Sequence, residues 1–147
     1  MAEIPDARRG RTARSVSPSW MPYLTKAIES MAGAELELAG KYHDSAVNRA
    51  YYACYQASVA ALVAEGVPPI VERYWPHDVV HVKFPSILID ALQRYPATQR
   101  GTLKAIFDER LKADYEPDSV GEETAAEAVR RARVFVDLIA ARVRASS

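Results

Sequence analysis

Apolar residues recur at three- and four-residue steps along most of this chain, and proline or glycine interrupts each run. No stretch alternates between apolar and polar residues with the two-residue period of a half-buried strand. The pattern therefore predicts an all-α protein, an up-and-down bundle of about five helices joined by short connections. A length of 147 residues suits a single domain.

Each predicted helix ends at a helix-breaking signal. The predicted helices cover residues 19–39, 44–65, 80–95, 97–113 and 119–144. Gly66, followed by two prolines, marks the end of the second helix. Pro85 falls inside the third helix, where we expect a kink or a fresh first turn. Asp118 or Ser119 is expected to cap the start of the last helix.

The first 18 residues differ in composition from the rest of the sequence. Residues 1–18 hold four arginines among small residues and proline, which predicts a flexible basic arm ahead of one helical domain at 19–147. The arm is either a tail without a role or a segment that touches phosphate.

Composition limits the classes of partner. Lysine plus arginine and aspartate plus glutamate both number 19, so no large field of one sign steers the molecule to a polyanion or a membrane. The single cysteine, Cys54, excludes an internal disulfide and suits a reducing compartment. No apolar run is long enough to span a bilayer, and no signal-peptide core follows the basic N-terminus. We predict a cytoplasmic protein without a membrane partner.

A polar stripe interrupts the second helix. Ser45, Arg49, Tyr52 and Gln56 follow one another at helical spacing beside an apolar, tyrosine-rich surface. The stripe carries one charge and neither lysine nor glutamate. Three interpretations stay open: a structural network or dimer contact, a ligand-facing surface, and plain solvent-facing helix.

Arg110 lies on the same line of the fourth helix as Ile106 and Asp114. An arginine on such a seam buries its methylene groups while its guanidinium reaches a carboxylate or a phosphate. The simplest interpretation is an ion pair between Arg110 and Asp114, four residues apart.

His77 and His81 are also four residues apart. The spacing aligns two metal ligands on a helix, but no cysteine cluster or further histidine accompanies them, so no metal site is predicted. We expect His77 to lie at a helix N-terminus, hydrogen-bonded to backbone or to Asp78. Sequence motifs for phosphate loops, nucleophile elbows and zinc sites do not occur, and no cofactor is predicted.

Three segments together resemble the HEPN (higher eukaryotes and prokaryotes nucleotide-binding) domain family. These segments are NRAYYA at residues 48–53, HDVVHVKF at residues 77–84 and RLKADY at residues 110–115. The resemblance extends from about Trp20 to Val143. It implies a bundle of about five helices that commonly dimerises, with a groove at the dimer interface.

In many HEPN proteins this groove is a metal-independent RNA endonuclease site, in which an arginine is followed after four to six residues by a histidine. Arg110 matches that arginine, but Tyr115, Glu116 and Pro117 stand where the histidine is needed. Cleavage through the 2'-hydroxyl requires proton transfer near pH 7, which histidine supplies and a tyrosine, with a reference pKa near ~10, does not. His77 replaces the missing base only if the third segment folds beside the fourth helix.

The resemblance and the missing histidine favour a HEPN protein with little or no nuclease activity. Such proteins often accompany a minimal nucleotidyltransferase in toxin–antitoxin or defence systems, so we expect a homodimer with that partner and a groove for RNA or nucleotide. The residues expected at the groove are Arg49, Tyr52, Arg110, Asp114 and Tyr115. The alternative is an endoribonuclease toxin that uses Arg110 for the phosphate and His77 or Tyr115 for proton transfer. In a third interpretation, arginine and aspartate only lock helix packing.

Overall fold

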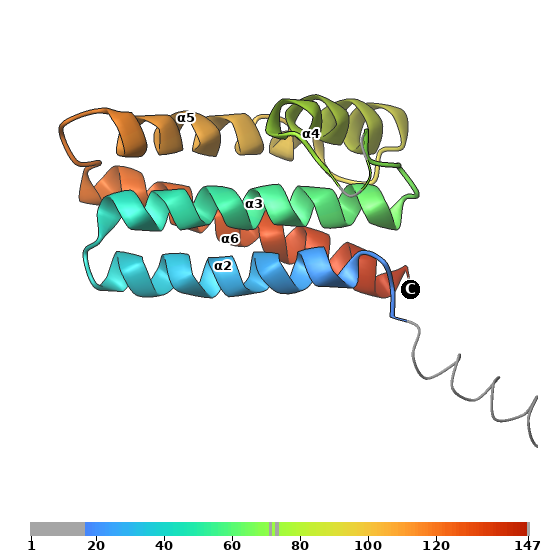
Figure 1. The fold of residues 1–147 in the computed structure, drawn as a ribbon, viewed down its shortest axis with the longest axis horizontal. Helices are drawn as coiled ribbons and strands as arrows, with labels where there is room; N and C mark the ends of the chain where they lie inside the picture. The colour runs from blue at the N-terminus through green and yellow to red at the C-terminus, as the bar shows by residue number, and fades with distance from the viewer. Residues whose placement is uncertain (1–16, 71, 73, 147) are drawn as a thin grey trace, which may run out of the picture.

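The computed structural model describes residues 17–70, 72 and 74–146, which form a bundle of helices (Figure 1). Its elements are α2 (Met21–Ala39), α3 (His43–Ala64), α4 (His77–Lys83), η1 (Phe84–Ala91), η2 (Ala97–Gln99), α5 (Thr102–Tyr115) and α6 (Glu122–Ala145). This part of the chain contains no strand, so the prediction of an all-α bundle is confirmed. Nor does it contain a helix both long and apolar enough to cross a bilayer. Most of the predicted N-terminal arm lies outside the described residues.

Helix α3 is the central element of the bundle. It runs between α2 on one side and α4 and α5 on the other, with α6 behind it (Figure 1), and it packs against all four and against η1. Its buried residues are Ala46, Val47, Ala50, Tyr51, Ala53, Cys54, Ala57, Ser58, Val59, Ala60, Ala61 and Leu62. Because half of these residues are alanine, neighbouring helices can approach closely on several sides.

A glycine turn and a long-range hydrogen bond define the two ends of α3. At its C-terminal end the chain leaves the helix through Gly66, whose φ of 78° is a left-handed conformation that glycine adopts without steric cost. At its N-terminal end Asp44 Oδ1 accepts a hydrogen bond of 2.8 Å from the backbone N–H of Val120. The prediction that Asp118 or Ser119 caps the last helix is wrong, because α6 begins later, after Gly121, without a side-chain cap.

The third predicted helix changes its type along its length. Helix α4 continues directly into η1, which has the wider turns of a π-helix, and Pro85 is the second residue of η1. Proline has no N–H to donate and its ring clashes with the preceding turn, so the regular α pattern cannot continue through it. The irregularity expected at Pro85 is therefore a change of helix type. The same segment carries His77 and His81 to the side of α3.

Candidate ligand site between α3, α4 and α5

Tyr51 of α3 is fully buried and joins two histidines of α4. Its hydroxyl oxygen lies 2.6 Å from His77 Nδ1 and 3.0 Å from His81 Nε2. The two histidines are one turn apart and so project from the same face of α4. His81 also meets the ring of Phe107 of α5 edge to face at 4.9 Å. His77 begins α4, as expected, but its hydrogen-bond partner among the described residues is Tyr51 and not backbone or Asp78.

Aromatic rings hold His77 on further sides. The ring of Tyr55 stacks on the imidazole at 4.1 Å with an interplanar angle of 4°, and Tyr52 meets it edge to face at 6.1 Å. Tyr55 is itself anchored by a hydrogen bond from its hydroxyl to the backbone carbonyl of Trp75. These contacts, added to the bond with Tyr51, leave the imidazole one orientation.

Arg110 of α5 approaches the same tyrosines. Its guanidinium carbon lies 5.3 Å from the ring centre of Tyr51 and 5.1 Å from that of Tyr52, which are cation–π distances. Nη2 donates a long hydrogen bond of 3.4 Å to the Tyr52 hydroxyl. The Nε of Arg110 is buried and 3.2 Å from Asp114 Oδ2, yet it makes no aligned hydrogen bond. Nε is thus closed to solvent, whereas Nη1 and the second hydrogen of Nη2 have no hydrogen-bond partner among the described residues.

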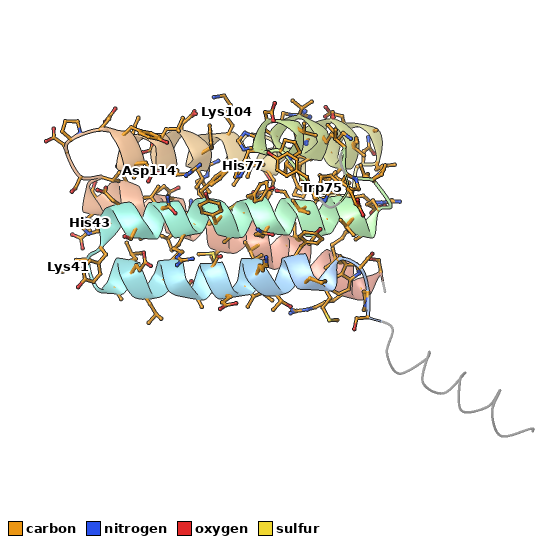
Figure 2. All side chains as sticks on the ribbon, viewed as in Figure 1. Lys41, His43, Trp75, His77, Lys104 and Asp114 are labelled. Atoms are coloured by element: carbon orange, nitrogen blue, oxygen red, sulfur yellow. The ribbon has the colours of Figure 1, made fainter. Side chains whose placement is uncertain are left out.

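Asp114 links α5 to α3. Its two carboxylate oxygens accept hydrogen bonds from Asn48 Nδ2 at 3.1 and 3.3 Å, and it forms the predicted ion pair with Arg110. Figure 2 shows Asp114 and His77 on the sides of their helices that face α3, whereas Lys104 points away from it. The structure thus brings together four of the predicted site residues, which are His77, Tyr52, Arg110 and Asp114.

Two further predicted residues lie outside this cluster. Arg49 is 55% exposed at its side chain and makes a loose ion pair of 3.7 Å with Glu37 of α2. Tyr115 is 77% exposed and makes no hydrogen bond or ring contact with the residues that the structure describes. Among the described residues, Tyr115 therefore makes no contact with the cluster.

Two adjoining hollows run along α3 and meet at Tyr52. The first, of about 580 Å³, lies between α2 and α3, and the second, of about 450 Å³, extends to Asp114 of α5. All four residues of the polar stripe line one or both: Ser45, Arg49, Tyr52 and Gln56. Their charged lining is Lys26, Arg49, Glu29, Glu37, Asp44 and Asp114, two basic against four acidic side chains. The stripe thus borders a groove, and that groove is acidic.

The cluster itself favours neutral side chains. Burial lowers the pKa of His77, the charge of Arg110 lowers it further, and Asp78 opposes both. Burial also lowers the pKa of His81; His77 and Lys104 add to this effect, while nearby carboxylates oppose it. Burial raises the pKa of the Tyr51 hydroxyl against the opposing charge of Arg110. At neutral pH both imidazoles and the phenol are therefore uncharged.

The central residue of the cluster, Tyr51, is not predicted as a site residue from the sequence. The ring of Tyr51 is buried with the apolar face of its helix, but the partners of its hydroxyl come from a segment 26 to 30 residues later. The spacing of His77 and His81 was the available signal, since two histidines on one helical face can share one partner. Among the residues that the structure describes, no three metal-ligating side chains come together.

The fold and this cluster define a helical bundle with a polar site beside its central helix. The family model of the HEPN domain matches residues 21–143, and the chain belongs to the HEPN domain family. No curated protein is similar enough in sequence to count as a match.

Proposed function

We propose that this HEPN protein binds the phosphate of RNA or of a nucleotide at Arg110, Tyr52 and His77, without cutting RNA. It acts in this proposal as one partner of a toxin–antitoxin or defence complex, with a minimal nucleotidyltransferase as the other partner. The observation that carries the proposal is Arg110, which is held by two tyrosine rings while most of its donors are unused. A planar guanidinium with free donors suits the oxygens of a phosphate.

The surroundings of Arg110 favour a ligand with few phosphates. A long nucleic-acid backbone requires several basic side chains along its path, but the hollows beside Arg110 carry more acidic than basic groups. A single phosphate needs only Arg110 and a neighbouring donor. Tyr52 supplies an aromatic ring beside Arg110, the type of side chain on which bases stack. A nucleotide or the end of a single strand therefore fits better than a duplex.

The binding test compares two arginines of equal charge. Arg110→Ala should weaken binding of a fluorescently labelled single-stranded RNA, or of a labelled adenosine nucleotide, by about tenfold or more. Arg130→Ala removes an exposed arginine of α6 that is paired with Glu127 outside the cluster, and it should leave the anisotropy titration unchanged. Equal affinities of the two variants, with both folded, would reject Arg110 as the phosphate ligand.

The complex in this proposal is built on a homodimer, as in many HEPN proteins. The groove next to Tyr52 is the proposed contact, because it is open, polar and continuous with the cluster. A charge introduced by Tyr52→Glu should then convert the dimer to a monomer in light scattering. An unchanged mass would remove this groove from the interface.

Endoribonuclease activity is the second candidate, because His77 lies beside Arg110 and is neutral at pH 7. An imidazole near a phosphate-binding arginine has the composition of a metal-independent ribonuclease site. The test is RNA cleavage in the presence of a chelator. If the wild type cuts, and Arg110→Ala and His77→Ala both lose cutting while their circular dichroism is preserved, the proposal of binding without cleavage fails.

A further inference from the structure

The hydroxyl of Tyr51 has one proton but faces two imidazole nitrogens. It can donate to only one of them, so the other nitrogen must carry a hydrogen and donate to the phenolic oxygen. Two arrangements satisfy this count when both histidines are neutral. Either Tyr51 donates to His77 and receives from His81, or the direction of both bonds is reversed.

The two distances distinguish the arrangements. Hydrogen bonds from a hydroxyl are shorter than those from an N–H group. The 2.6 Å contact with His77 Nδ1 therefore suits donation by the hydroxyl, and the 3.0 Å contact with His81 Nε2 suits donation by the imidazole. In this arrangement His77 Nδ1 is an acceptor, and the hydrogen of His77 is on Nε2.

We propose that Tyr51 and His81 hold His77 as its Nε2–H tautomer, so that His77 offers a ligand a neutral hydrogen-bond donor and not a base. Tyr51 and His81 are then positioning residues for the phosphate site. This inference rests on the proposed function for the identity of the ligand, but the tautomer itself is a property of the free protein.

The packing around His77 preserves this arrangement. Tyr55 covers one face of the ring. The hydrogen bond of this imidazole is at Nδ1, and Nε2 has no partner among the described residues. The charged groups that act on the two histidines are Asp78 from α4 itself and Lys104, Asp108 and Arg110 from α5. Lys104 and Asp108 pair with each other at 3.2 Å, and Arg110 pairs with Asp114 at 3.2 Å.

The consequence is a site with two kinds of donor. Arg110 supplies charge, and His77 supplies one directed N–H without a second positive charge. An anionic oxygen can accept from both. Because Nε2 already carries its hydrogen, it cannot remove a proton from a ribose 2'-hydroxyl, which gives the proposed binding without cleavage a cause apart from the missing histidine near Tyr115.

Nitrogen-15 NMR of the imidazole rings tests this inference in the free protein. The chain has three histidines, and His43, at the N-terminal end of α3, serves as an internal reference (Figure 2). At neutral pH His77 and His81 should both give the pattern of the Nε2–H tautomer. In Tyr51→Phe the pKa of His77 should rise, because its neutral form loses a donor, and that of His81 should fall, because its N–H loses an acceptor. The resonances of His43 should not move.

A matched pair of variants tests the part of His81. His81→Gln keeps an N–H donor near the position of Nε2 and should preserve the tautomer of His77, whereas His81→Leu should produce a mixture of tautomers. An Nδ1–H pattern for His77 in the wild type would overturn the inference, and so would an unchanged tautomer and pKa in folded Tyr51→Phe. Failure to bind labelled RNA or nucleotide would reject the proposed function alone, since these spectra are recorded without ligand.

Discussion

Arg110 and Arg49 were predicted for the same groove, but the structure gives them different surroundings. The side chain of Arg110 is 18% exposed, lies against two tyrosine rings and is close to Asp114. The side chain of Arg49 is 55% exposed and has one ion pair of 3.7 Å, with Glu37. A guanidinium that is partly buried and held by flat rings has a defined position, whereas an exposed one is free to change rotamer.

This difference separates a ligand site from its border. Arg110 loses little conformational entropy when it binds a ligand, because the tyrosines already restrict it. Arg49 must be ordered at the moment of binding, and salt screens its charge. The same residue type on adjoining helices therefore has unequal value for recognition.

Arg110→Ala should give the largest change. Loss of the contacts with both tyrosine rings and of the ion pair with Asp114 should lower the free energy of unfolding by about 1 to 3 kcal/mol. Urea denaturation followed by circular dichroism measures this loss. Arg130→Ala, at an exposed and locally paired arginine, is the control and should cost less than about 0.5 kcal/mol. Equal costs for the two variants would mean that the rings do not hold Arg110.

Asp114→Asn should have an intermediate effect, lowering the stability of the fold but raising the affinity for the ligand. The amide loses the charge that faces Arg110, so stability should fall by about 1 kcal/mol or less, given that both side chains are partly exposed. Binding of labelled RNA or nucleotide should become tighter, because the acidic competitor for the Arg110 donors is gone. Weaker binding would instead show that Asp114 positions Arg110. In that case Asp114→Ala, which lacks any side-chain acceptor, should weaken binding further.

A smaller effect is expected from pH. The pKa values of His77 and His81 are lowered in the folded state from the ordinary value of 6.5. As pH falls below about 6.5, the unfolded chain takes up protons that the folded protein does not, so stability decreases; above that pH these histidines cause no change. Urea midpoints measured between about pH 7 and pH 5.5 should follow this slope. His81→Gln should reduce it, and an equal slope would exclude His81 as a contributor.

The sequence was sufficient for the helices and for part of the site. Periodicity and helix-breaking residues predicted the bundle, and the line through Ile106 and Arg110 predicted the pair with Asp114, because these signals act within one helix. The hydroxyl of Tyr51 could not be matched to His77 in this way. That contact depends on how α4 packs on α3 after a connection of twelve residues, numbers 65–76, and no local pattern encodes such a packing. Arg110 and Arg49 also differ in burial, and burial likewise depends on tertiary contacts.

Arg49→Ala completes the comparison with the smallest expected effect. An exposed ion pair of 3.7 Å contributes little, so stability should change by less than about 0.5 kcal/mol. If Arg49 borders the ligand site, its loss should weaken binding by a few fold at low salt and hardly at all at high salt, whereas the effect of Arg110→Ala should persist at both. Anisotropy titrations at two ionic strengths distinguish these outcomes. A loss for Arg49→Ala as large and as salt-resistant as that for Arg110→Ala would place the phosphate in the α2–α3 hollow and not beside His77.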